Sequence, residues 1–148
     1  MDVNWEQIDQ YSEELAEKIK KSNYQCDAII GIASGGLIPT TYLSKLLGIK
    51  KIGLFCAKSY CDQTQCSLEI ISRPQIDLEN KSVLLVDDLV DTGITVKRIK
   101  QILVAEYNVK EVRVVAYFVN KEHCNEYPEF YVKENEGWVV FPWELKEN

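Results

Sequence analysis

The chain has 148 residues, of which 46% are hydrophobic and 27% are charged, and this size and balance suit one globular domain around one core. No apolar run approaches the roughly 20 residues of a membrane span, so we expect no contact with a membrane. The net charge of −6 argues against nucleic acid as a partner, because broad electrostatic binding needs basic patches. The negative net charge does not exclude a small phosphate ligand, since a few backbone N–H groups can bind a phosphate locally.

Two features of the sequence bear on the cellular compartment. The N-terminus shows no basic stretch followed by an apolar one, so we expect no secretory signal. Without such a signal, the odd number of five cysteines indicates reduced thiols and a cytoplasmic protein.

Helical and strand patterns alternate along the chain. The expected elements are a helix over 5–21, a strand over 28–33, a helix over 38–47, strands over 51–57, 68–71 and 82–86, a helix over 94–107 and a strand over 112–118. This alternation is typical of an α/β protein with a mainly parallel sheet between helices, and we expect one domain over residues 1–148. The polar stretch Lys58 to Ser67 lacks periodicity and is predicted to be a mobile loop.

The segment Val83 to Thr95 carries the chemistry. Its apolar strand delivers two adjacent acids, Asp87 and Asp88, to the carboxyl end, where ligands bind in open α/β sheets. The glycine-containing loop that follows opens a helix, and its free N–H groups form an anion site. Paired carboxylates suit ribose hydroxyls and a hard cation such as Mg²⁺.

An alternative interpretation of the same segment is structural. Asp87 and Asp88 could be helix-capping residues in a solvated turn, and a lone pair of acids would favour that interpretation. The complete order favours function instead: an apolar strand, two acids, a third acid at Asp91, a Thr-Gly pair and a second threonine at Thr95.

The central segment resembles the motif of type I phosphoribosyltransferases that binds phosphoribosyl pyrophosphate (PRPP). Ile32 to Pro39 is similar to the pyrophosphate loop of that family, and Ser59-Tyr60 is similar to the start of its flexible catalytic loop. Trp138 to Glu144 resembles the base-binding tail of bacterial xanthine-guanine phosphoribosyltransferases. Together the matches extend from about residue 27 to residue 144. The resemblance therefore implies the fold of this family, with a small hood formed by the C-terminal tail.

The resemblance also implies a reaction, the Mg²⁺-dependent transfer of a phosphoribosyl group from PRPP to a 6-oxopurine. Ser34, Gly35 and Gly36 would bind pyrophosphate, Asp87 and Asp88 would hold Mg²⁺ or the ribose hydroxyls, and Asp91 would act as acid–base catalyst near N7 of the base. The residues implied to bind the ribose 5-phosphate part of PRPP are Asp87, Asp88, Asp91, Thr92, Gly93, Ile94 and Thr95.

Three residues would contact the base. Trp138 would stack on the purine, the Val139 carbonyl would face its C2 edge, and Lys121 would donate to the 6-oxo group. The structural alternatives are a core tryptophan at Trp138 and a solvated surface lysine at Lys121. The choice among guanine, xanthine and hypoxanthine stays open, since it depends on backbone groups at the C2 edge.

Ser34 departs from the family pattern, because xanthine-guanine enzymes usually carry a basic residue before Gly-Gly. Lys58 and Arg73, on either side of the polar loop, are candidates for a compensating cation. The departure keeps two alternatives open: a phosphoribosyltransferase for adenine or a pyrimidine, and a non-catalytic regulator that binds PRPP or nucleotide. The family commonly forms oligomers, so we expect a homodimer or homotetramer.

Overall fold

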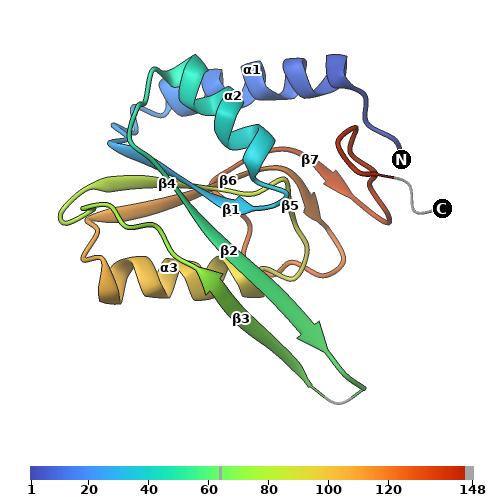
Figure 1. Ribbon diagram of the computed structural model, residues 1–148. Coiled ribbons are helices and arrows are strands. Elements are labelled where there is room, and N and C mark those ends of the chain that lie inside the picture. Colours follow the sequence, from blue (N-terminus) through green and yellow to red (C-terminus); the bar gives the residue numbers. More distant parts are fainter. Residues whose placement is uncertain (64, 146–148) are drawn as a thin grey trace.

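The computed structural model describes residues 1–63 and 65–145. Three helices cover a sheet whose strands lie in the order β3-β2-β1-β4-β6-β5, and β7 pairs with the other edge of β6 (Figure 1). The strands are β1 (Ala28–Ala33), β2 (Ile52–Cys61), β3 (Cys66–Ser72), β4 (Ser82–Val86), β5 (Leu89–Val90), β6 (Glu111–Asn120) and β7 (Phe130–Asn135). The described ladders are parallel except that of β2 with β3. The expected α/β class with a mainly parallel sheet is therefore confirmed.

The helices are α1 (Trp5–Lys21), α2 (Leu37–Leu47) and α3 (Ile94–Glu106). Asn4 and Gln7 form a capping box that starts α1, and its buried residues recur at helical spacing. Helices α1 and α2 cover one face of the sheet, and α3 covers the other (Figure 1). Strand β4 is consequently buried on both faces, which explains its continuous apolar run.

The predicted loop over Lys58 to Ser67 is wrong. Strands β2 and β3 continue through most of this segment as an antiparallel hairpin, in which Ser59 pairs with Leu68 and Tyr60 pairs with Ser67. The hairpin projects away from the body of the molecule, so most of its side chains are exposed (Figure 1). A strand with two solvated faces shows no apolar alternation, and its pattern therefore resembles that of a loop.

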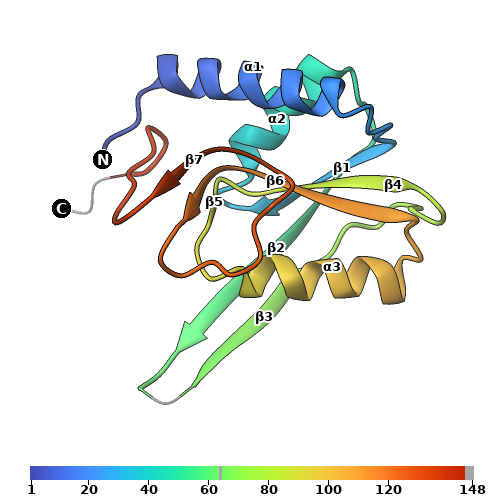
Figure 2. The ribbon, with the colours of Figure 1, turned by 180° about the vertical axis from the view of Figure 1, so that it is seen from behind.

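The C-terminal tail returns to the N-terminus, as Figure 2 shows from behind. The Val3 N–H donates to the Val140 carbonyl, and Asp2 and Val140 form a parallel bridge. Phe141 and Trp143 stack at a centroid distance of 4.7 Å beside α1. Packing of this kind gives the tail a rigid base.

The expectation of reduced thiols holds for part of the cysteines. Cys26, Cys56 and Cys124 carry free thiols, whereas Cys66 at the start of β3 is disulfide-bonded, which corrects the prediction at that position. Within the described ranges, no helix combines the length and apolar character that a bilayer crossing requires.

Candidate functional site

Asp87 and Asp88 interrupt what is otherwise one strand. Strands β4 and β5 pair with β6 in the same register on either side of the two acids. The ladder continues through them, since the Asp87 N–H donates to the Val115 carbonyl and the Asp88 carbonyl accepts from the Tyr117 N–H. On the opposite edge, the pairing of β1 with β4 ends at Gly31 and Val86. The acids thus lie where two parallel strands separate, the position at which such sheets bind ligands.

The two carboxyl groups lie in a poorly solvated place. Burial raises the pKa of Asp87 well above its ordinary value, and the charge of Asp88 raises it further. Burial also raises the pKa of Asp88, although the Leu89 N–H donates to its Oδ1 atom at 2.7 Å. Bound positive charge or hydroxyl donors would favour the ionised forms of this pair.

The donor set fits a hard divalent cation that keeps other ligands. Across residues 1–63 and 65–145, no three acid, histidine or cysteine side chains gather as a ready-made metal cage. Two adjacent carboxylates without further protein ligands suit Mg²⁺, which retains waters and binds ligand phosphates. Asp87 and Asp88 are therefore chemically suited to the metal role that the sequence predicts.

The loop after β1 packs directly against the second acid. A Cβ atom added to Gly35 would lie 2.5 Å from the Asp88 Oδ2 atom, and one added to Gly36 would lie 2.6 Å from the Val86 carbonyl oxygen. Both distances are closer than real Cβ atoms approach. Gly36 faces backbone atoms and has no room for a side chain, whereas a side chain at position 35 would displace the Asp88 carboxylate. The peptide between Ala33 and Ser34 is cis, and Ser34 is exposed. The loop thus places the exposed Ser34 and the half-buried Gly35 next to the Asp88 carboxylate at the start of α2.

The loop after β5 opens α3 with free backbone donors. Gly93 occupies the N-cap position with φ of 90° and has no side chain to cap the helix. The Oγ1 atom of the exposed Thr92 accepts from the Ile94 N–H at 3.3 Å. A helix N-terminus of this kind attracts an anion through its free N–H groups and its dipole.

One cavity of about 290 Å³ lies between Asp87, the loop that opens α3 and the hairpin. Its walls include Asp87, the residues 89–96 and, from β2, Ser59. Tyr60 lies outside this cavity, where the Lys58 ammonium stands 5.2 Å from its ring centroid. The structure therefore brings Ser59 to the site, while Tyr60 faces elsewhere.

Asp91 has two partners that the sequence did not reveal. Its Oδ1 atom accepts a hydrogen bond from Asn120 Nδ2 at 2.8 Å and lies 2.9 Å from His123 Nδ1. Asn120 ends β6, and His123 follows in the next turn. His123 is the single histidine of the chain, a signal in itself, but its separation from Asp91 in sequence concealed the contact.

The residues predicted to contact a base are less closely grouped. Lys121 directs its ammonium toward Glu136, at 3.5 Å, and is more than half exposed. Asn120, its neighbour, points toward Asp91 instead. Trp138 is 81% exposed, which excludes a core role for its ring, whereas the Val139 side chain is 5% exposed and belongs to the core.

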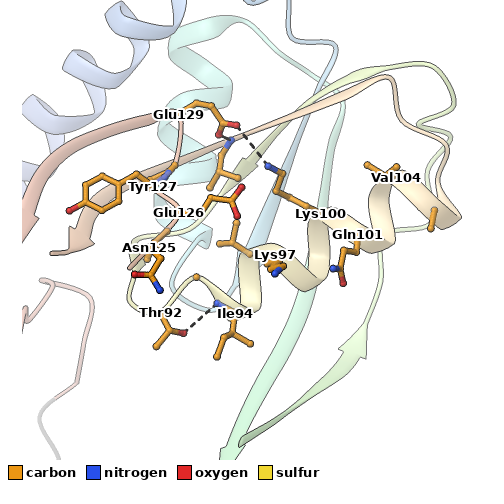
Figure 3. A pocket seen from close by; sticks show the side chains of 16 residues that line it. Thr92, Ile94, Lys97, Lys100, Gln101, Val104, Asn125, Glu126, Tyr127 and Glu129 are labelled. Atoms are coloured by element: carbon orange, nitrogen blue, oxygen red, sulfur yellow. Dashed lines mark hydrogen bonds and ion pairs between the residues drawn. The ribbon is translucent and has the colours of Figure 1, made fainter. Parts of the chain in front are cut away.

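A second cavity, of about 670 Å³, lies behind the loop that opens α3. Figure 3 shows Asn125, Glu126 and Tyr127 on one side of it, with Lys97 and Gln101 of α3 on the other. Its walls do not include the three acids of the central segment. It nevertheless adjoins the site at the strand ends, since Val90, Thr92, Gly93, Ile94 and Val96 line both cavities.

Comparisons with known proteins agree with this geometry. A family model described as the phosphoribosyl transferase domain matches residues 4–148. The chain is 30% identical to a xanthine-guanine phosphoribosyltransferase of Chromohalobacter salexigens, over 97% of this chain and 83% of that protein. It superimposes with a TM-score of 0.89 on a purine phosphoribosyltransferase of Pyrococcus horikoshii, at 32% identity and over 100% and 96% of the two chains. A hypothetical protein of Neisseria gonorrhoeae with bound ppGpp is 26% identical over 97% and 88% of the chains, with a TM-score of 0.78.

Proposed function

The chain belongs to the phosphoribosyltransferase domain family, and from this premise we propose that it transfers the 5-phosphoribosyl group of PRPP to a 6-oxopurine base. The products are the nucleoside 5′-monophosphate and pyrophosphate, and the acceptor is guanine, xanthine or hypoxanthine. One observation carries the proposal. Asp87 and the loop from Asp91 to Thr95 share one cavity, while Gly35 holds the other loop against Asp88. Anion donors and acids thus lie on both sides of the pair Asp87 and Asp88.

We assign the PRPP contacts to these groups. The N–H groups and hydroxyls from Thr92 to Thr95, at the start of α3, bind the 5-phosphate. Asp87 and Asp88 hold the ribose hydroxyls directly or through Mg²⁺, which when bound stabilises the negative charge of the leaving group. Backbone N–H groups of Ser34 and Gly35 bind the pyrophosphate, whereas the Gly36 N–H donates to the Ile32 carbonyl at 2.7 Å and holds the loop in place.

Asp91 is the proposed catalytic residue. The purine nitrogen attacks C1′ of the ribose while the bond from C1′ to pyrophosphate breaks, and the electron pair leaves with pyrophosphate. The base must lose a proton during this step, and the Asp91 carboxylate accepts or shares it near N7. More than half of the Asp91 side chain is exposed, so a bound base has access to it.

The tail supplies the base contacts in this proposal. The free ring of Trp138 stacks on the purine, and the Val139 carbonyl faces the C2 edge. Lys121 serves the 6-oxo group only if its ammonium leaves Glu136, from which 3.5 Å separates it. An exposed ion pair of this kind is weak, so exchange for a substrate oxygen costs little.

Trp138→Ala should raise the KM for the purine about 5- to 150-fold, because base–aromatic stacking contributes roughly 1–3 kcal/mol. The KM for PRPP should stay near the wild-type value, since the ring lies on the tail and not in the phosphate loops. Steady-state kinetics with each substrate varied in turn measures both constants. Trp138→Phe keeps an aromatic face and serves as the matched control; an unchanged purine KM in the alanine variant would refute the stacking role.

Gly35→Ala should raise the Kd for PRPP in the presence of Mg²⁺ by at least about tenfold, since the new methyl group displaces the Asp88 carboxylate. Isothermal titration calorimetry measures this constant. Gly48→Ala is the control, because Gly48 has a positive φ but no atom within 4 Å of an added Cβ. That variant should lose about 1 kcal/mol of stability and no PRPP affinity. Equal PRPP affinity in both variants would contradict the close packing of Gly35 on Asp88.

The test of the function itself is a pyrophosphate-release assay with PRPP and Mg²⁺. Guanine, xanthine, hypoxanthine, adenine, orotate and uracil are each supplied separately. Release with a 6-oxopurine and not with adenine is the expected result. Release with adenine or a pyrimidine alone would keep the transferase but overturn the roles of Lys121 and Trp138.

A second candidate function is nucleotide-dependent regulation without catalysis. Two observations favour keeping it: Ser34 brings no positive charge to the pyrophosphate loop, and the Neisseria gonorrhoeae relative was solved with bound ppGpp. Of the two candidate cations, Arg73 is paired with Glu106 at 2.8 Å, and the Lys58 ammonium lies 5.2 Å from the Tyr60 ring, outside the cavity. No release with any base, together with tight binding of PRPP or nucleotide, would establish this function in place of the first.

We also propose a homodimer or homotetramer in the cytoplasm. Exposed apolar side chains on α2 and β2, such as Leu37, Ile52 and Leu54, support an interface between copies. Both substrates of the proposed reaction are metabolites of the cytoplasm. Sedimentation velocity would give the oligomeric state.

A further inference from the structure

We propose that His123 and Asn120 are positioning residues that hold the Asp91 carboxylate in its reactive orientation. This inference rests on the proposed function, in which Asp91 receives the proton of the base. Nothing in the central sequence motif requires either residue, and both come from the segment around the end of β6. The carboxylate that performs the chemistry is thus oriented by groups 29 and 32 residues away in the sequence.

Asn120 is the buried and more firmly held of the two residues. The residue is 9% exposed, and its Oδ1 atom accepts from the Glu122 N–H at 3.0 Å. That bond determines which side of the amide holds oxygen, so Nδ2 faces Asp91 and donates to it at 2.8 Å. A buried amide held at both ends loses little further entropy when it donates to Asp91.

His123 is the exposed one of the two residues, and its surroundings favour one tautomer of the imidazole. Nδ1 lies 2.9 Å from Asp91 Oδ1 and 3.2 Å from Asn120 Nδ2. An unprotonated Nδ1 could accept from Asn120 Nδ2, but it would also direct its lone pair at the charged Asp91 Oδ1 atom 2.9 Å away, which is repulsive. A protonated Nδ1 donates to Asp91, and both donors then converge on one oxygen.

This convergence has a consequence for the reaction. Both donors use Oδ1, so the Oδ2 atom of Asp91 stays available for the base proton. The Asp91 side chain is 57% exposed and would otherwise sample several rotamers. A misplacement of about 1 Å in a reacting group can cost on the order of 10²-fold in rate. We therefore expect the loss of His123 to lower kcat by about 10- to 100-fold with little change in PRPP binding.

Kinetics of three variants test this expectation. His123→Ala removes the donor, and the exposed side chain makes normal folding the expected outcome. His123→Asn places an amide N–H where Nδ1 stood and should restore most of kcat, whereas the control Glu122→Gln should match the wild type. An alanine variant with wild-type kcat, or an asparagine variant as slow as the alanine variant, would overturn the positioning role.

Nuclear magnetic resonance tests the same contact without turnover. His123 gives the only histidine signals of the chain, so long-range ¹H–¹⁵N spectra need no assignment. At alkaline pH, the wild type should show the Nδ1–H tautomer, and Asp91→Ala should shift the balance toward Nε2–H. Identical tautomers in the two proteins would refute the contact. If the two proteins differ in tautomer as expected, yet the wild type releases no pyrophosphate with any base, the proposed function is refuted instead.

Discussion

Asp91→Asn is expected to lower kcat by about 10²- to 10⁴-fold, the range of general acid–base catalysis. The substitution keeps the shape of the side chain and an oxygen that accepts from Asn120 and His123. It removes the basic oxygen that takes the purine proton. Binding of PRPP should change less than about threefold, because the N–H groups of the loop after Asp91 are unaffected.

Rapid-quench single-turnover kinetics, with PRPP binding measured separately, would distinguish these two effects. Asp77→Asn is the matched control, since Asp77 lies in an exposed loop and its Oδ1 atom only accepts from the Glu79 N–H. This control should keep wild-type turnover and affinity. If Asp91→Asn loses turnover and PRPP affinity by the same factor, the residue binds substrate and does not transfer the proton.

The local structure of the central segment could be predicted because its signals are local in sequence. A strand buried on both faces must be continuously apolar, and Ser82–Val86 is. The acids follow this strand at once, and Gly93 marks the start of α3, where its positive φ favours glycine. A chain that carries all three signals within the twelve residues from Ser82 to Gly93 leaves few alternatives for that segment.

What escaped prediction depends on contacts across long sequence separations. The exposed hairpin at Ser59 has no apolar face, so no periodicity indicated its strands. The end of β6 turns Asn120 toward Asp91, a contact that the sequence around Lys121 did not indicate. The partnership of Asp91 with His123 arises from tertiary packing, which no local pattern reveals.

Replacing both acids, Asp87→Asn with Asp88→Asn, is expected to abolish Mg²⁺-dependent PRPP binding and to raise the Tm of the free protein by a few degrees. Asp87 accepts from the backbone N–H of residue 88, and Asp88 accepts from that of Leu89. An asparagine at each position keeps an oxygen that accepts the same hydrogen bond. The amides bind no divalent cation of consequence and need no ionisation. Calorimetric titration with PRPP and Mg²⁺, together with thermal unfolding without ligands, measures the two effects.

The gain in stability should depend on pH in a defined direction. The pKa of Asp87 in the folded state is raised above its ordinary value of 3.8 by burial and by Asp88, so the folded state binds more protons than the unfolded state between these values. The free energy of unfolding of the wild type must then fall as pH rises through this window. The double variant lacks this loss, and its Tm advantage should be small in acid, grow with pH, and become constant above the raised pKa. Saturating PRPP with Mg²⁺ should raise the Tm of the wild type, because the bound ligands favour the ionised acids. The same ligands should leave the Tm of the variant unchanged. A Tm advantage that shrinks as pH rises would contradict burial as the cause of the raised pKa.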